Sequence, residues 1–379
     1  GDLVFEEEFP EGFSRTWKYS PALHNKNKVE YANLYCGGLS IEEVCPPHIE
    51  DRLQTHTEKL KAFVRSFKES KVSLEQNCFF DLVPHKFLIN YYDVKNDICK
   101  YIFEVYERPT NYRFLRQLDA VLTEIAQRPL NIDLSSLKYD THALPVKNFI
   151  NKVRSSKPVC DYNLFGTKTG RLTTKKNTFP ILTMDKRYRS IIKPTNDWFL
   201  ELDFNAAELR TILALNKKDQ PAIDLHDWNA RHVYEGNKTR EEAKKSIFAW
   251  LYNPDSKDHA PEKFYDKTLL KHNYYMNGSV INPYGREILA DDHHAINYLV
   301  QSTSADNTLR QMIRISKLLE NCKSFIAFTM HDSVVIDLDH DEKELIPVLA
   351  YTFSGTDMGE FLVNVSAGED FGCMRPLEQ

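Results

Sequence analysis

Two stretches decide the fold of this chain: WFLELDFNAAELR at Trp198–Arg210 and FIAFTMHDSVVID at Phe325–Asp337. Each places an aspartate, Asp203 or Asp332, at the end of an apolar run that is typical of a buried strand. Two such carboxylates on adjacent strands, at the edge of a sheet, are what a pair of divalent metal ions roughly 4 Å apart requires for in-line phosphoryl transfer. The plainer alternative is that each aspartate only marks a turn.

A helix is expected directly after Asp203. Asn205 is a suitable N-cap, Ala206–Leu215 is rich in helix formers, and Glu208 falls in the first turn, where the helix dipole favours a carboxylate. This order of strand, carboxylate and helix resembles motif A of DNA polymerase I-like (family A) enzymes. The tripeptide His331-Asp332-Ser333 resembles motif C of the same family, in which the third residue is more commonly glutamate than serine.

The segment NKTREEAKKSIFAWLYNPD, residues 237–255, predicts a capped helix with an unusual face. Thr239 and Glu242 form a capping box, and Asn253-Pro254 ends the helix. Four residues spaced by four share one face: Arg240, Lys244, Phe248 and Tyr252. Two cations followed by two aromatic rings suit a triphosphate and a base with its sugar, whereas an ordinary amphipathic helix is the alternative. The spacing resembles the fingers helix of the same family, except that Asn253 replaces its usual glycine.

A basic strip lies upstream of the first aspartate. Thr169-Gly170-Arg171-Leu172 resembles the family's TGRL signature, whose arginine contacts the primer–template duplex. From Leu164 to Lys193 one acid stands against eight basic residues, which are Lys168, Arg171, Lys175, Lys176, Lys186, Arg187, Arg189 and Lys193. Such a strip is expected to bind nucleic-acid phosphates, and a solvated basic loop is the alternative.

Two further signatures follow the family's order along the chain. Asn297 and Gln301 resemble the second half of motif B, whose side chains reach the minor groove and the template strand. Asp224-Leu225-His226 resembles a D-x-H motif whose histidine meets the incoming triphosphate, although a lone histidine is more often structural. His293 stands where the family often has an arginine. The resemblance covers the chain from about Leu134 onward.

Composition is compatible with this interpretation. The chain has 379 residues and a net charge of −5, which does not forbid nucleic-acid binding because the distribution of charge matters more than its sum. Seven scattered cysteines form no CxxC pair and indicate reduced thiols in an intracellular protein. No apolar stretch approaches the roughly 20 residues of a membrane span.

The N-terminal third is the least explained part. Residues 1–130 are expected to be helical, with amphipathic helices at His48–Ser70 and Tyr112–Gln127. This region is either an exonuclease remnant or thumb-like, and it lacks a recognisable nuclease acid cluster. Residues 131–379 are expected to form the polymerase core, with a palm at 160–215 and 280–379 and fingers at about 216–279.

The resemblance implies an α+β, right-hand polymerase fold with an antiparallel-sheet palm, helical fingers and a reduced helical thumb. It implies template-directed DNA synthesis from dNTPs on primer–template DNA, with a processivity or replisome partner that supplies the grip lost with the thumb. Two Mg²⁺ ions would be held by Asp203 and Asp332. Lys244 is the expected catalytic cation, aided by Arg240 and His226 at the triphosphate.

Phe248, Tyr252 and Glu208 are expected at the sugar and the nascent base pair. The residues expected to contact DNA are Arg171, Lys175, Lys176, Asn297, Gln301 and His331. Ser333 implies that a third acid near the metals is missing. Two alternatives stay open: a single-subunit RNA polymerase-like enzyme, against which Glu208 argues, and a catalytically silent palm-fold module that binds DNA in a replication assembly.

Overall fold

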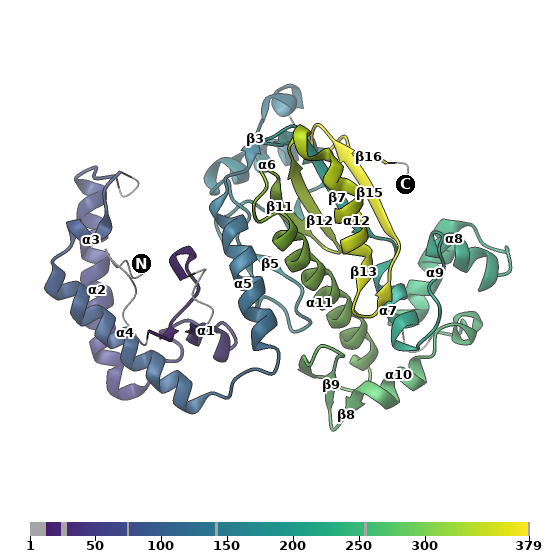
Figure 1. The fold of residues 1–379 in the computed structure, drawn as a ribbon, viewed down its shortest axis with the longest axis horizontal. Coiled ribbons are helices and arrows are strands. Elements are labelled where there is room, and N and C mark those ends of the chain that lie inside the picture. The colour runs from purple at the N-terminus through teal and green to yellow at the C-terminus, as the bar shows by residue number, and fades with distance from the viewer. Residues whose placement is uncertain (1–12, 24–28, 74–75, 141–142, 254–255, 378–379) are drawn as a thin grey trace. The chain divides into compact units, whose positions relative to one another are not determined.

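The computed structural model describes residues 13–23, 29–73, 76–140, 143–253 and 256–377. The chain divides into two compact units, residues 1–123 and 124–379 (Figure 1). Both helices and strands contribute, so the expected α+β class is confirmed at that level. Among the described residues, every helix is too short or too polar to cross a membrane.

The first unit is mainly helical. Its long helices α2 and α4 pack on each other, and their core includes Ile49, Leu53, Val94 and Ile98. The predicted amphipathic helix at His48–Ser70 is confirmed as α2, whose first two turns carry its buried residues. The elements are β1 (Arg15–Thr16), β2 (Glu30–Tyr31), α1 (Ala32–Tyr35), α2 (Pro47–Glu69), α3 (Phe79–Leu82), α4 (His85–Val105) and α5 (Tyr112–Gln127), within which the division falls.

A five-stranded antiparallel sheet forms the centre of the second unit. Its strand order is β11-β12-β7-β15-β16, with β7 in the middle. The strands are β7 (Trp198–Phe204), β11 (Phe325–Met330), β12 (Ser333–Leu338), β15 (Val363–Gly368) and β16 (Arg375–Pro376). Short strands form smaller sheets: β3 (Asn131–Ile132), β4 (Tyr162–Asn163), β5 (Thr173–Thr174), β6 (Ile192–Lys193), β8 (Tyr275–Met276), β9 (Ser279–Ile281), β10 (Glu287–Leu289), β13 (Gly355–Thr356) and β14 (Gly359–Glu360).

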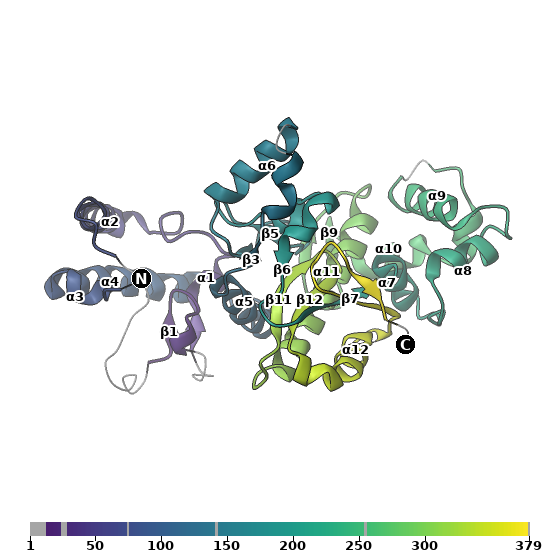
Figure 2. The same cartoon turned by 90° about the horizontal axis from the view of Figure 1, so that it is seen from above.

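The helices of this unit are α6 (Leu144–Ser155), α7 (Ala207–Leu215), α8 (Leu225–His232), α9 (Arg240–Tyr252), α10 (Lys267–Tyr274), α11 (Ala295–Leu318) and α12 (Ile346–Ser354). Figures 1 and 2 both show α8 and α9 side by side at one end of this unit. One hydrophobic cluster joins α7, α8, α9, α10 and the start of α11, so this helical group has its own core beside the sheet.

The interior of α11 is unusually polar. Asp306 on this helix is fully buried and accepts hydrogen bonds from Arg286 Nε at 2.9 Å and Nη2 at 2.6 Å. Asn282 donates a third hydrogen bond to the same carboxylate at 2.8 Å. A Cβ added at Gly170, whose φ is +77°, would lie 2.5 Å from the Arg286 guanidinium. The ion pair therefore ties α11 to the β9–β10 turn and passes directly beside the loop at Gly170.

We expect Asp306→Ala to lower the free energy of unfolding by about 3–5 kcal/mol, because it leaves the largely buried Arg286 guanidinium without its counter-charge. Urea unfolding followed by circular dichroism measures the change. Asp341→Ala removes an acid from an exposed ion pair with Lys323 and serves as the matched control, which should unfold almost like the wild type. Equal midpoints for both variants would contradict the structural role of Asp306.

Candidate functional site

The register of β12 on β7 brings the two sequence-predicted aspartates to one end of the sheet. Ser333, the first residue of β12, lies opposite Asp203 near the end of β7. The Phe204 amide donates to the Asp332 carbonyl at 3.3 Å. The expectation that the two aspartate-bearing strands are adjacent is wrong, because β12 lies between β11 and β7. Asp332 reaches β7 from the turn that joins β11 to β12.

That turn contains a strained residue. His331 has a φ of +55°, in the left-handed region that a residue with a Cβ seldom adopts. Its side chain is exposed, and the neighbouring Asp332 is partly buried. Backbone strain of this kind costs about 1–3 kcal/mol and persists where the surroundings hold it in place. Here the pairing of Met330 with Ser333 closes the turn.

The two carboxylates are difficult to ionise. Burial raises the pKa of Asp203 to about 7, and the negative charges of Glu201 and Asp332 add to the shift. Burial also raises the pKa of Asp332 to about 6, together with the charge of Glu208. Nearby cations offset these effects only in part. The end of the sheet thus has an excess of negative charge that a bound cation would neutralise.

The donor set fits a hard divalent cation, because carboxylate oxygens are the ligands that such ions prefer. In the part of the chain that the structure describes, however, no three His, Cys, Asp or Glu side chains converge as a metal site. Asp203 and Asp332 therefore stand as a pair. Asn364 on β15 donates to Asp203 at 3.4 Å and orients that carboxylate.

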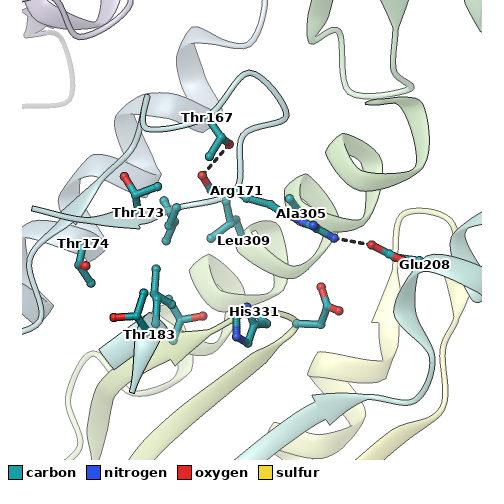
Figure 3. Close-up of a pocket in the computed structure, with 13 residues that line it drawn as sticks. Thr167, Arg171, Thr173, Thr174, Thr183, Glu208, Ala305, Leu309 and His331 are labelled. Carbon is teal, nitrogen blue, oxygen red and sulfur yellow. Dashed lines mark hydrogen bonds and ion pairs between the residues drawn. The ribbon is translucent and has the colours of Figure 1, made fainter. Parts of the chain in front are cut away.

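A cavity of about 660 Å³ opens beside Asp332. Its walls come from the loop at Thr167–Thr174, from α11 and from the β11–β12 turn, and Arg171 reaches across it to Glu208 (Figure 3). His331 lies below this pair in the view. Of the predicted site residues, the cavity collects Arg171, Glu208, His331 and Asp332.

Glu208 connects three separate elements. From the first turn of α7 its carboxylate accepts hydrogen bonds from Arg171 and from the hydroxyl of Tyr252 at the end of α9. Burial and the charge of Glu208 raise the pKa of Tyr252 well above its usual value, and a hydrogen bond from Gln301 opposes the shift. The predicted residues Arg171, Glu208, Tyr252 and Gln301 are thus brought together.

The helix predicted within residues 237–255 is confirmed as α9, and so is its Thr239–Glu242 capping box. Asn253-Pro254 was expected to end this helix. Asn253 is its C-cap, and Pro254 lies outside the described residues. Phe248 and Tyr252 stack with ring centroids 6.0 Å apart, and the His226 ring lies 5.9 Å from Phe248. Lys244 is exposed on the same helix. Burial lowers the pKa of His226 to about 4, and among the described residues its Nδ1 atom has no hydrogen-bond partner.

The expected N-cap at Asn205 is wrong. The N-cap of α7 is Ala206, with left-handed φ and ψ of 51° and 49°. Asn205 is instead buried, where its amide donates to Asp224 at 2.8 Å and its oxygen accepts from Leu225 and Arg210. Burial of these backbone and side-chain polar groups outweighs the local capping preference, because each needs a partner once water is excluded.

Arg210 is a residue whose importance sequence reasoning missed. Its guanidinium is fully buried and donates to Asn205, Pro221 and Ile223. The sequence signal was a charged residue in the middle of a mostly apolar helix. Asp224 accepts from Arg240 Nη2 at 2.9 Å, so Asn205, Arg210 and Asp224 tie the end of β7 to α8 and α9.

Several cations of the basic strip at residues 164–193 already have partners within the protein. Lys175, Arg187 and Lys193 pair with Asp161, Asp185 and Asp370, and Arg189 lies over the ring of Phe371. Lys176 is exposed. Asn297, partly buried on the first turn of α11, has a buried side-chain oxygen with no partner among the described residues.

Comparisons with known proteins agree with this architecture. No family model matches the chain. It is 26% identical to a DNA polymerase of Mycobacterium phage D29, over 36% of this chain and 28% of the length of that protein. Its fold is similar to that of the POL domain of Pol1 from M. smegmatis, solved in complex with DNA primer-template and dNTP; the TM-score is 0.56 at 14% identity, covering 76% of each chain. These similarities support the resemblance to family A DNA polymerases.

The Asp224–Arg240 pair predicts an acid-sensitive stability. Although burial alone would raise the pKa of Asp224, hydrogen bonds from Arg240, Asn205 and the Asp227 amide lower it well below its usual value of 3.8. The stabilisation is complete above that value and is lost as pH falls below it. Asp224→Asn should therefore reduce the urea midpoint at pH 7 and differ less from the wild type near pH 3. A difference that stays constant with pH would contradict the assignment.

Proposed function

We propose that this chain, similar in fold and in part of its sequence to DNA polymerase I-like proteins, is a template-directed DNA polymerase that adds deoxynucleotides to a primer 3′ end. One observation carries the proposal: the pair of partly buried carboxylates Asp203 and Asp332 at one end of the antiparallel sheet, beside the Arg171–Glu208–Tyr252 contact. A turn-marking role alone would not place two desolvated acids of like charge together.

Asp203 and Asp332 would hold two divalent cations, with Mg²⁺ as the proposed ion. When bound, such ions lower the pKa of the primer 3′-hydroxyl and stabilise the charge of the leaving pyrophosphate. The protein's own contribution is positioning. The strands hold the two acids on a rigid base, and Asn364 orients Asp203 by a hydrogen bond.

The face of α9 is proposed as the nucleotide site. Lys244 is exposed, and among the described residues no acid pairs with it, so it is available to the triphosphate. Arg240 and His226 would contribute there as well, with Arg240 oriented by Asp224. Phe248 and Tyr252 present stacked rings to the sugar and the nascent base pair.

Primer–template DNA is proposed to lie along the cavity walls and the basic strip. Arg171, Lys175, Lys176 and His331 are exposed, and Arg171 and His331 line the cavity. Asn297 and Gln301 lie on the first turns of α11. In this assignment residues 160–215 and 280–379 form the palm and residues 216–279 the fingers. The thumb is reduced, so a processivity or replisome partner would extend the grip on the duplex.

Asp203→Asn and Asp332→Asn should each abolish primer extension while DNA affinity stays nearly unchanged, because each removes a cation ligand but no phosphate contact. Extension of a labelled primer with Mg²⁺ and dNTPs, alongside fluorescence anisotropy for DNA binding, measures both properties. Parallel lanes with NTPs test the RNA polymerase alternative. Extension above trace levels in either variant would refute the two-acid assignment, and an inactive wild type that binds DNA would favour the silent module.

Glu208→Ala should increase ribonucleotide incorporation relative to deoxynucleotide by roughly 10-fold or more, because it opens space beneath the sugar 2′ position. Glu208→Gln is the matched control: it removes the charge that holds Arg171 and Tyr252 but keeps the volume. Single-nucleotide incorporation kinetics with dCTP and CTP give the ratio. If both variants shift the ratio equally, charge and not volume selects the sugar.

A further inference from the structure

Glu201 lies on the same face of β7 as Asp203. Alternate residues of a strand share a face, and both side chains are partly exposed while their neighbours Leu200, Leu202 and Phe204 are buried. Its carboxylate accepts a hydrogen bond from the Ser333 hydroxyl at 3.1 Å. The wall of the site therefore contains a third acid that motif spacing did not reveal.

A carboxylate in this position is unfavourable for the isolated protein. Glu201 occupies the central strand of the sheet, and among the described residues no Lys, Arg or His pairs with it. Glu201 and Asp203 place two like charges on one face of the strand. A neutral residue that keeps the hydrogen bond from Ser333 would remove that repulsion, so the charge of Glu201 has no stabilising role that its described contacts explain.

Glu201 lies beside Ser333, the position at which the sequence departs from the motif C that it resembles. Ser333 stands where related enzymes have a glutamate, and it faces Asp203 across the β12–β7 ladder, while Val335 faces Glu201. Positions 333 and 201 are therefore diagonal neighbours, whose Cβ atoms are separated by about 7–8 Å or somewhat less. A glutamate at either position can extend into the space between them, and the Ser333–Glu201 hydrogen bond spans that space.

We propose that Glu201 is a positioning residue of the cation site, whose charge supports the Asp203–Asp332 pair in place of an acid at position 333. The proposal deepens the proposed function and rests on it. Because no three acids converge as a metal site among the described residues, Glu201 acts outside the Asp203–Asp332 pair. It is a positioning residue that increases cation affinity by its charge and orientation, which Ser333 fixes.

Glu201→Gln tests the charge alone, because the amide oxygen can still accept the Ser333 hydrogen bond. Mn²⁺ binding to the purified protein, followed by the electron paramagnetic resonance signal of the free ion, should weaken by roughly 10- to 100-fold, the usual effect of losing such a supporting group. The melting temperature without divalent cation should rise at the same time, because a repulsion is removed. A merely structural role predicts a lower melting temperature and unchanged Mn²⁺ affinity.

Glu369→Gln is the matched control. Glu369 is exposed just beyond β15 and lies five residues from Asn364, the partner of Asp203, or roughly 16 Å along the strand. It removes the same charge and should leave Mn²⁺ affinity unchanged. The double variant Glu201→Gln/Ser333→Glu should restore affinity to within about 3-fold of the wild type, because it returns the acid to the adjacent strand.

The proposal is overturned if Glu201→Gln binds Mn²⁺ like the wild type, or if the double variant binds no better than Glu201→Gln. Primer extension by the wild type is measured separately. If the wild type does not extend a primer, the proposed function fails, whereas the Mn²⁺ affinities still decide whether Glu201 belongs to a cation site. If the wild type extends primers and the Mn²⁺ affinities do not differ, only the role of Glu201 fails.

Discussion

The pairing of β12 with β7 is the constraint on which the site depends. It holds Asp203 and Asp332 at the same end of the sheet, although burial and like charge both oppose their ionisation. Such an arrangement persists only if the strands beneath it are rigid, and every residue of β12 is buried. The left-handed His331 in the connecting turn adds strain at the same place. The like charges and the strained turn thus lower stability locally, at the position of the proposed cation site.

The helical group is connected to this strand end by polar contacts. Glu208 links the first turn of α7 to Tyr252 on α9 and to Arg171 on the loop. Asn205 and Asp224 link the end of β7 to α8 and, through Arg240, to the N-terminus of α9. A movement of α9 would therefore also affect the end of β7 that carries Asp203. This coupling is what the proposed function requires, because a nucleotide on α9 would have to meet the acids on the sheet.

Many of the basic side chains upstream of Asp203 form ion pairs within the protein. The chain is acidic overall, and several cations of its basic strip are paired within the protein, including Lys175 with Asp161 and Lys193 with Asp370. In the proposed DNA-binding role, phosphates would compete with those acids, so fewer cations than the sequence suggests would be available for binding. Lys176 and Lys244, which are exposed and have no ion pair with a described residue, would then contribute more to the proposed binding.

The sequence by itself determined the elements and the types of residue at the site. Apolar runs and helical spacing predicted β7, β11, α5 and α9 because these signals are local, and two aspartates, a basic loop and a cation–aromatic face indicated phosphoryl-transfer chemistry. Only the tertiary structure decided which strands pair and which side chains meet at the site. The insertion of β12 between β11 and β7, the burial of Asn205 in place of a cap, and the approach of Glu201 to Ser333 all depend on pairing between segments more than 100 residues apart or on exclusion of water. Long-range pairing and the exclusion of water produce no periodic pattern in the sequence, because strand register and burial are properties of the assembled sheet.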